Sequence, residues 1–271
     1  LRAAAGCSLH PRGPSEDALR RACGRLVHVD DVERLYAYRR WLASDEPPRL
    51  DSMPVRERRL LRMLVASVAE RALGKTTTLD QACALLWMHP QVRAELVELA
   101  EVLVARIDHL QQPLASHADV PLQIHARYTR IEMLGAFGIG SSAKVPPWQA
   151  GVYWAKEQSA DLLAFTLDKT TGQFSPTTRY RDYAVSRDLV HWESQSATRA
   201  DSETGLRYQT HRERGTSIML FARLRTDTRA FWFLGPAQYV RHESELPMAI
   251  TWRLDHPLPG DLFETFAAAV A

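Results

Sequence analysis

The N-terminal part of the chain carries apolar residues at helical spacing. Between Val92 and Leu110 they recur at steps of four, three, four, four and three residues, shortly after Pro90. This period places them on one face of an amphipathic helix, and proline is favoured at the first position of a helix. The pattern therefore predicts a long helix that begins at Pro90 and runs to Leu110.

Shorter helices are marked by pairs of residues at capping-box spacing, in which a short polar residue is followed three positions later by Glu or Gln. The pairs are Asp30 with Glu33, Thr78 with Gln81, and Thr129 with Glu132. The last pair opens a helix expected over 129–137, which Gly138 ends. We expect a helical segment over residues 1–118.

Beyond Pro146 and Pro147 the pattern changes to short strands separated by glycine and proline. The expected strands are 151–156, 161–168, 180–185, 189–195, 217–225, 231–240 and 248–254. Seven strands without helices between them are typical of a closed or half-closed antiparallel barrel. The predicted fold class is therefore α+β, with the helical segment followed by an antiparallel β-barrel-like domain over residues 119–271.

Composition narrows the picture only a little. The chain has 271 residues, a net charge of +2 and 24% charged residues, which is ordinary for a folded protein. Of its 34 basic residues four are lysines, which leaves 34 − 4 = 30 arginines. Arginine suits phosphate and base edges, but an excess also follows from codon bias. The near-neutral balance argues against a polycationic coat for nonspecific nucleic-acid binding.

Several classes of protein are not supported. Three scattered cysteines give neither a disulfide framework nor a zinc site, and no metal or cofactor is expected. Uncharged apolar runs such as 64–69 are far shorter than the roughly 20 residues that span a bilayer. No signal peptide is visible, so we expect a cytoplasmic protein without a membrane partner. Because the first residue is Leu1, we expect a piece of a longer polypeptide.

The tripeptide 74–76, Gly-Lys-Thr, ends like a phosphate-binding loop. Such a loop needs an earlier glycine at position 69, where this chain has Ala69, and a preceding strand, where the pattern is helical. We therefore interpret 74–76 as a turn between helices.

The expected strand 189–195 is the most informative segment. Alternation along a strand makes His191, Glu193 and Gln195 project together, while the residues between them project to the opposite face. Glutamine can bind an adenine edge in bidentate fashion, and glutamate can accept a hydrogen bond from cytosine. A strand with three polar side chains on one face is either a solvated outer face or a recognition surface.

Two flanking segments mix arginine with tyrosine or histidine. Segment 175–183 reads as a turn that offers hydroxyl, guanidinium and ring contacts, and segment 207–212 repeats the mixture on an expected strand. Together with the central strand they predict one nucleic-acid-binding surface. Its residues are Arg179, Tyr180, Arg181, His191, Trp192, Glu193, Gln195, Ser196, Arg199, Arg207, Tyr208 and His211. In contrast, 231–234 and Trp252 are expected in the core.

A nuclease interpretation of the same strand stays open. Asp182 followed by Glu193-x-Gln195 is a degraded form of the pattern in which two acids hold Mg²⁺. The lysine of that pattern is replaced by Gln195, and His191 would be the candidate base. A third alternative is a protein-interaction or ligand-sensing regulatory domain.

Blocks of sequence across the second half of the chain resemble the domain of unknown function numbered 3427. The blocks are 125–130, 165–169, 180–186, 191–196, 233–237 and 247–252, with His-Trp-Glu-Ser-Gln at 191–195 the most specific. Segment 26–35 and the helices that follow resemble the linker region before that domain. The family is typically found at the C-terminal end of bacterial superfamily-two helicases that also carry a phospholipase-D-like nuclease domain.

The resemblance implies a role in restriction or phage defence, with DNA and the helicase and nuclease domains of a longer polypeptide as partners. Helicase and nuclease motifs are absent from this sequence, so those activities are not carried over. We therefore expect a DNA-recognition module, a reader of a sequence or a modified base, rather than an enzyme.

Overall fold

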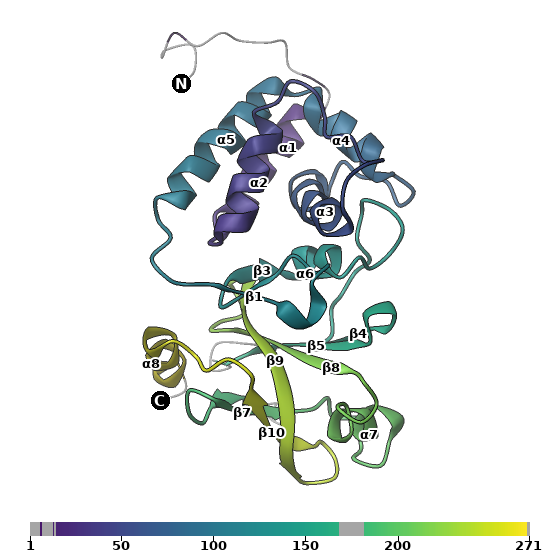
Figure 1. Cartoon of the computed structure of the whole chain (residues 1–271), viewed down its shortest axis with the longest axis vertical. Coiled ribbons are helices and arrows are strands. Elements are labelled where there is room, and N and C mark those ends of the chain that lie inside the picture. The colour runs from purple at the N-terminus through teal and green to yellow at the C-terminus, as the bar shows by residue number, and fades with distance from the viewer. Residues whose placement is uncertain (1–5, 7–12, 14, 168–181, 270–271) are drawn as a thin grey trace. The chain divides into compact units, whose positions relative to one another are not determined.

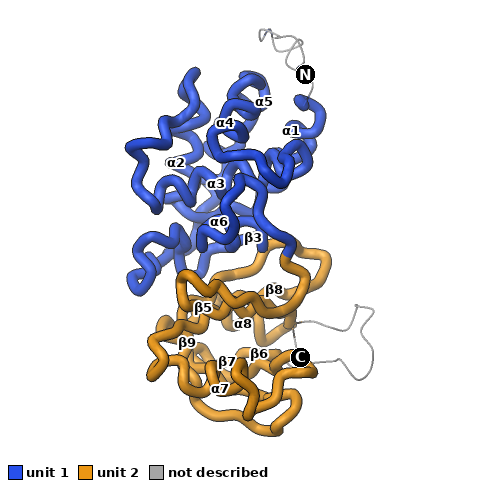
Figure 2. The backbone as a smooth tube through the Cα atoms, turned by 90° about the vertical axis from the view of Figure 1, so that its right-hand side faces the viewer, with its two compact units in different colours: residues 1–147 blue, residues 148–271 orange. Residues whose placement is uncertain are grey.

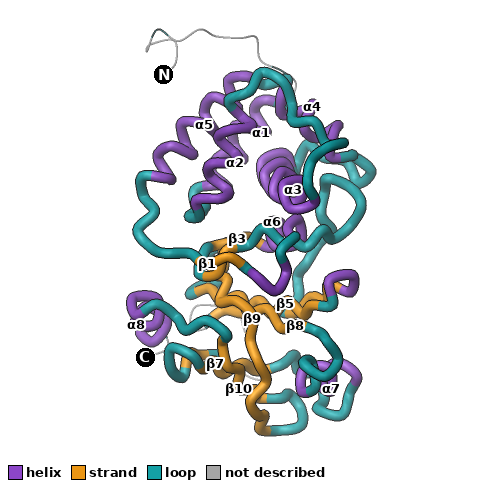
Figure 3. The backbone as a smooth tube through the Cα atoms, in the orientation of Figure 1, coloured by secondary structure: helices purple, strands orange, loops and turns teal. Residues whose placement is uncertain are grey.

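In the computed structural model, the described residues are Gly6, Gly13, 15–167 and 182–269. The chain divides into two compact units, residues 1–147 and 148–271 (Figure 2). Helices dominate the first unit and strands the second (Figure 3), so the class is α+β with a helical N-terminal part, as predicted. The boundary predicted at residue 118 falls inside the first unit.

The N-terminal unit consists of six α-helices, two 3-10 turns and three short strands within its described residues (Figure 1). They are α1 (Glu16–Cys23), η1 (Gly24–Leu26), α2 (Val32–Leu42), α3 (Val55–Ala69), α4 (Leu79–Trp87), α5 (Pro90–Val104), β1 (Gln112–Pro113), η2 (Ala115–His117), β2 (Gln123–Ile124), β3 (Arg127–Thr129) and α6 (Arg130–Ala136).

Local signals placed most of these helices. The capping boxes at Thr78 before α4 and at Thr129 before α6 are both formed, with side-chain and backbone bonds in each direction. Pro90 opens α5 as predicted, but the helix ends at Val104 instead of Leu110. Leu110 is 88% exposed. The apolar spacing therefore continues in the sequence after Val104, but Leu110 does not pack against the core. Apolar period alone therefore overestimated the length of α5.

A network of buried charges connects α2 with α6 inside the N-terminal unit. The Arg34 side chain is fully buried; its Nε donates to Asp31, its Nη1 donates to Glu132 at 2.7 Å, and its Nη2 donates to the Arg127 carbonyl at 2.6 Å. The guanidinium also lies 4.0 Å from the centre of the Tyr128 ring. Desolvated charges need this degree of pairing, because each ion loses its hydration on burial.

Glu132 is the second fully buried charge of this network. His28 Nε2 lies 2.6 Å from its carboxylate, and the Thr129 backbone N–H and hydroxyl both donate to it. Burial alone would raise the pKa of Glu132, but the charges of His28 and Arg34 together with these hydrogen bonds lower it to about 2. The carboxylate is therefore held in its ionised form.

The C-terminal unit contains a seven-strand array and two α-helices within the described residues. Its elements are β4 (Val152–Ala155), η3 (Lys156–Gln158), β5 (Ala160–Thr166), β6 (Tyr183–Ala184), β7 (Leu189–Glu193), α7 (Glu203–Gln209), β8 (Ser217–Arg223), β9 (Ala230–Glu243), β10 (Ala249–Leu254) and α8 (Gly260–Ala268). The strands follow the order β4-β5-β8-β9-β10-β7-β6.

The prediction of an antiparallel barrel is wrong in two respects: the sheet is not closed, and one pair of strands is parallel. β4 and β6 stand at opposite ends of the strand order, so the sheet is open, and β5 pairs with β8 in parallel. The long strand β9 links the two halves, because it pairs with β8 through 232–237 and with β10 through 237–243. Tyr208 of α7 and Phe266 of α8 contribute to the same buried core as the strands.

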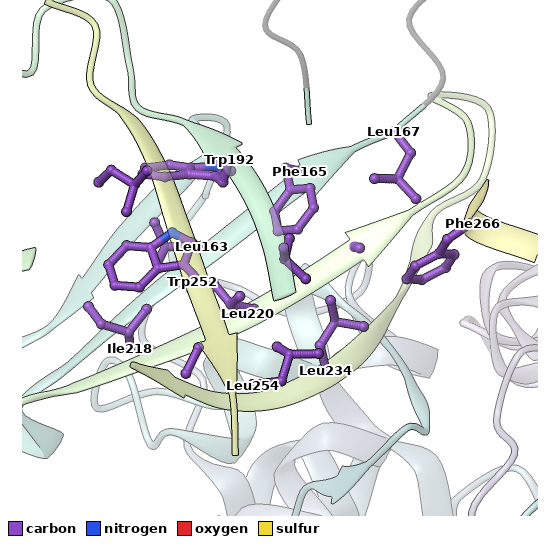
Figure 4. Close-up of a cluster of buried hydrophobic side chains, with 14 of the residues drawn as sticks. Leu163, Phe165, Leu167, Trp192, Ile218, Leu220, Leu234, Trp252, Leu254 and Phe266 are labelled. Carbon is purple, nitrogen blue, oxygen red and sulfur yellow. The ribbon is translucent and has the colours of Figure 1, made fainter. Parts of the chain in front are cut away.

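One buried cluster fills the inner side of this sheet (Figure 4). It takes side chains from β5, β7, β8, β9 and β10, and includes Trp192, Leu220, Leu234 and Trp252. Continuous apolar runs on β5 and β8 are buried on both faces, which explains why they read as unbroken hydrophobic segments. The strands β6, β7 and β10 instead bury one face, and their other face carries the polar residues described next.

Candidate nucleic-acid interface

Strand β7 alternates between buried and half-exposed side chains. Val190 and Trp192 are buried, whereas His191 and Glu193 are partly exposed. The predicted alternation is therefore confirmed over the strand itself. Gln195 is exposed but lies beyond Glu193, where the strand has ended, so strand geometry does not fix its direction.

Strand register extends the outer side of β7 into a row of four side chains. Tyr183 of β6 is paired with His191, His191 with Thr251 of β10, and Thr251 with Arg241 of β9. Residues paired directly across strands project to the same face of a sheet. The Tyr183 and His191 rings are stacked, with their centroids 4.9 Å apart and an interplanar angle of 27°.

A second row runs parallel to the first. Arg253 of β10 is paired with Leu189 of β7 on one side and with Gln238 of β9 on the other. The Arg253 side chain is exposed, and no hydrogen bond or ion pair joins it to any other residue in the described ranges. We use the name open face for six residues of these two rows. They are Tyr183, Leu189, His191, Arg241, Thr251 and Arg253.

Charge changes along the open face. In the next row Ala249 is paired with Glu193 and with Glu243, so one acid lies beside His191 on β7 and the other lies beside Arg241 on β9. Arg241 and Arg253 provide positive charge in the two rows described above, and Arg241 lies 3.6 Å from Glu243 with both side chains about 70% exposed. A base stacked on Tyr183 would thus have guanidinium groups and carboxylates within the same sheet surface.

Segment 207–212 is helical at its start, so its prediction as a strand was wrong. The Ser202 hydroxyl accepts the Gly205 N–H at 3.1 Å and caps α7, an arrangement that strand propensities did not reveal. Arg207 forms two hydrogen bonds with the buried Asp161, at 2.7 and 2.9 Å, and lies over the Trp154 ring. Arg207 is therefore a structural partner of Asp161 and is largely unavailable for phosphate.

Tyr208 and His211 are buried as well. Burial raises the pKa of Tyr208, and burial lowers the pKa of His211 below 6.5, with the charge of Arg212 acting in the same direction. The His211 Nε2 accepts the Tyr239 N–H at 3.2 Å, so the neutral ring carries its proton on Nδ1. Trp192 belongs to the same buried group, and hence offers no accessible wall for a base.

The remaining predicted residues are divided between the surface and the undescribed part of the chain. Ser196 and Arg199 are exposed, and Arg199 pairs with Asp201 at 2.9 Å. Arg179, Tyr180 and Arg181 lie outside the described residues. The surface predicted from sequence therefore keeps His191, Glu193, Gln195, Ser196 and Arg199.

The nuclease interpretation finds no open pair of carboxylates. Asp182 is 4% exposed, and its Oδ1 accepts the backbone N–H of Glu193 at 2.9 Å. It thereby joins the start of β6 to the end of β7, a structural task. Across the described ranges, no group of three or more His, Cys, Asp or Glu side chains is placed to hold a metal ion.

Sequence reasoning missed Thr251, Arg241 and Arg253, and it included Tyr183 in the segment 175–183 without naming it as a site residue. Thr251 and Arg253 flank the buried Trp252, so the period of two along β10 already placed them on its outer side. Arg241 could not be found in this way, because the register of β9 shifts between Thr251 and Trp252 of its partner strand. Only the paired strands show that these residues continue the row from His191.

Comparison with known proteins gives one family. A model described as a domain of unknown function, DUF3427, matches residues 122–266, which is more than half of the chain. The search of curated proteins found no match to this chain. Across the described residues, no helix is both long and apolar enough to cross a membrane.

Two solved structures show limited similarity, both of Arabidopsis thaliana SUVH6 in complex with SAM. Form 2 is 14% identical with a TM-score of 0.37 over 76% of this chain, and form 1 is 12% identical with a TM-score of 0.33 over 90% of it. In both cases the match spans 40% of the SUVH6 chain. Similarity at this level carries no argument about function.

Proposed function

We propose, for a chain that belongs to the DUF3427 family, that its C-terminal unit is a DNA-recognition module and that the open face contacts the DNA. The observation that carries this proposal is a row of four side chains on the outer side of the adjacent strands β6, β7, β10 and β9. The row consists of Tyr183, His191, Thr251 and Arg241. The row combines stacked rings, a hydroxyl and a guanidinium group, which are the groups that bind bases and phosphates.

The stacked rings favour a base that has left its duplex stack. Tyr183 is 37% exposed at the edge strand β6, so we expect an unpaired or extruded base to reach the ring pair from that side. Stacking on an aromatic side chain contributes about 1–3 kcal/mol per base. Arg241 and Arg253 would neutralise phosphates next to that base, while Glu193 would accept from an exocyclic amino group.

The identity of the base, and the attachment of this module to helicase and nuclease domains, form the finer part of the proposal. The resemblance supports that context, because the family typically accompanies such domains. A reader of sequence or of a modified base would direct the attached machinery to selected DNA. Three more predicted residues, Gln195, Ser196 and Arg199, follow β7 directly. They would contact the same DNA strand as the open face.

The test is fluorescence anisotropy of labelled 20-nucleotide single strands, duplexes and duplexes with one mismatched or modified base. We expect Tyr183→Ala to weaken binding about 5- to 150-fold, which is the stacking energy expressed as a ratio. Arg241→Gln should weaken binding less and reduce the slope of log affinity against log salt by about one phosphate contact. The control is Arg225→Gln, which removes an exposed arginine paired with Asp227 outside both rows.

Two results would overturn the proposal. One is the absence of salt-dependent binding to every oligonucleotide. The other is binding in which Tyr183→Ala and Arg241→Gln behave like Arg225→Gln. A preference for intact duplex over single strands and mismatched duplexes would contradict the stacking step while leaving DNA binding itself in place.

A further inference from the structure

The loop after α6 is rich in glycine and serine and lies at the surface of the N-terminal unit. Residues 138–144 read Gly-Ile-Gly-Ser-Ser-Ala-Lys. Gly138 and Gly140 have φ of +70° and +81°, in the left-handed region that side chains rarely adopt. Gly140 and Ser141 are exposed. The two glycines thus leave backbone that has no side chain of its own.

Two arginines of α3 pack against this backbone. A Cβ atom at Gly138 would lie 3.1 Å from the Arg59 Nε, and one at Gly140 would lie 3.5 Å from the Arg62 Nη2. The Arg62 Nη2 also donates to the Ile139 carbonyl at 2.6 Å. The glycines therefore allow both guanidinium groups to approach the loop from α3.

The charge of Arg62 has no counter-charge in the described part of the chain. Arg62 is 7% exposed, forms no ion pair with any described carboxylate, and its buried Nε has no hydrogen-bond partner there. Burial lowers the pKa of Arg62, and the neighbouring charge of Arg59 lowers it further. An isolated buried cation is costly, and a bound anion removes that cost.

The same loop is joined to the turn between α3 and α4. The Ala143 N–H donates to the Thr77 carbonyl at 2.8 Å, and the Lys144 Nζ donates to the Leu73 carbonyl at 3.2 Å. This turn contains the Gly-Lys-Thr tripeptide 74–76, which connects two helices as predicted, and its Lys75 is exposed. The turn fixes the loop and adds positive charge beside it.

We propose that the loop 138–142 and the guanidinium groups of Arg59 and Arg62 bind a phosphate group. Arginine forks bind phosphate oxygens in bidentate fashion, and the anion would supply the counter-charge that Arg62 lacks among the described residues. The phosphate belongs either to a DNA backbone or to a small phosphorylated molecule. The site lies in the N-terminal unit and does not depend on DNA binding by the open face.

The experiment is isothermal titration calorimetry of the whole chain with inorganic phosphate, with chloride at matched ionic strength as the reference. We expect wild-type protein to bind phosphate specifically. Arg62→Gln and Arg59→Gln should each weaken binding about ten-fold or more, since each removes charge-assisted hydrogen bonds. Arg40→Gln is the matched control, because Arg40 pairs with Glu57 on the surface of the same unit.

A second variant keeps the test decisive if Arg62→Gln does not fold. Ser141→Asp places a carboxylate in the exposed part of the loop, where it competes with phosphate for the arginines without disturbing the core. We expect it to abolish phosphate binding while the circular dichroism spectrum is unchanged. The proposal is overturned if wild-type protein binds phosphate no better than chloride, or if Arg59→Gln and Ser141→Asp bind it like Arg40→Gln.

A competition measurement identifies the source of the phosphate. If phosphate and a 20-nucleotide strand compete, and Arg59→Gln weakens both, the ligand is a DNA backbone phosphate. If phosphate binds without changing affinity for DNA, the ligand is a small phosphorylated molecule. Both outcomes support the site, and they are distinguishable from failure of the open face, which Tyr183→Ala tests separately.

Discussion

Both units of this protein have a mainly apolar interior, and they differ in the kind of buried cluster that it contains. In the N-terminal unit, Arg34 and Glu132 are buried as ions and linked by charge-assisted hydrogen bonds. In the C-terminal unit, Trp252 is surrounded by the rings of Trp192, Tyr208 and Tyr239, with centroids 6.1–6.4 Å away. Ionic contacts require particular partners, whereas ring contacts depend mainly on shape and area. We therefore expect the charge network to select the pairing of α2 with α6, and the ring cluster to stabilise packing with less selectivity.

The strongest way to break the buried charge network is to remove Arg34, the cation that Asp31 and Glu132 share. Arg34→Met leaves the buried carboxylate of Asp31 without its nearest counter-charge and leaves Glu132 with His28 alone, so we expect the free energy of unfolding to fall by about 3–5 kcal/mol. Urea-induced unfolding followed by circular dichroism measures it. Arg40→Met, which breaks the exposed pair with Glu57, should cost less than about 1 kcal/mol. Equal losses in the two variants would contradict this role of Arg34.

A charge-free triple variant sharpens this result. Asp31→Asn, Arg34→Met and Glu132→Gln together keep groups that can still cap α2 and α6 but remove the buried charges. We expect the triple variant to regain more than half of the stability lost in Arg34→Met, because no isolated ion remains. If it is no more stable than the single variant, hydrogen-bond geometry rather than charge dominates the network.

The two interiors should also respond to acid in different pH ranges. The fold keeps the pKa of Glu132 at about 2, against an ordinary 4.5, so the unfolded chain takes up the proton first. The resulting stabilisation, about 3 kcal/mol, is complete above pH 4.5 and is lost as pH falls toward 2. In Glu132→Gln, the free energy of unfolding measured over this pH range should depend less on pH.

His211 acts at higher pH in the C-terminal unit. Burial lowers its pKa below 6.5, so the folded protein favours the neutral ring while the unfolded chain binds protons already near pH 6.5. Stability is therefore present above pH 6.5 and decreases as pH falls through the folded pKa. His211→Gln should reduce the pH dependence of the unfolding free energy below pH 6.5. An unchanged slope would show that other groups control it.

A smaller effect tests the aromatic interior. Trp252→Phe shortens the central ring and weakens its contacts with three aromatic neighbours, for an expected loss of about 1–3 kcal/mol. The loss stays moderate because the Trp252 Nε1 has no hydrogen-bond partner among the described residues, so the substitution also removes an unsatisfied donor. Thermal unfolding measures it, and a loss as large as that of Arg34→Met would contradict the comparison.

What the sequence could predict was set by distance along the chain. The capping boxes at Thr78 and Thr129 and the alternation of His191 with Trp192 depend on residues within a few positions, and they were found. The contact between Arg34 and Glu132 joins residues 98 positions apart, and no local pattern indicates it. The parallel pairing of β5 with β8 was missed for the same reason, and with it the open form of the sheet.

The candidate site shows the same limit. His191 and Glu193 were assigned correctly to the outer side of β7, because a period of two is visible in sequence. Arg207 was predicted as a phosphate contact, yet its guanidinium pairs with Asp161, 46 positions earlier. A charged side chain in a binding-like segment is thus ambiguous until its partner is known, and for Arg207 the partner is internal.

The link between α2 and α6 also bears on how this fold can be isolated. The family match begins at residue 122 and includes Glu132, but it leaves out Arg34 and His28. A protein trimmed to the matched residues would keep an acid whose two basic neighbours had been cut away. The boundary given by sequence similarity therefore differs from the boundary that keeps the charge network intact. A shortened protein should begin upstream of His28.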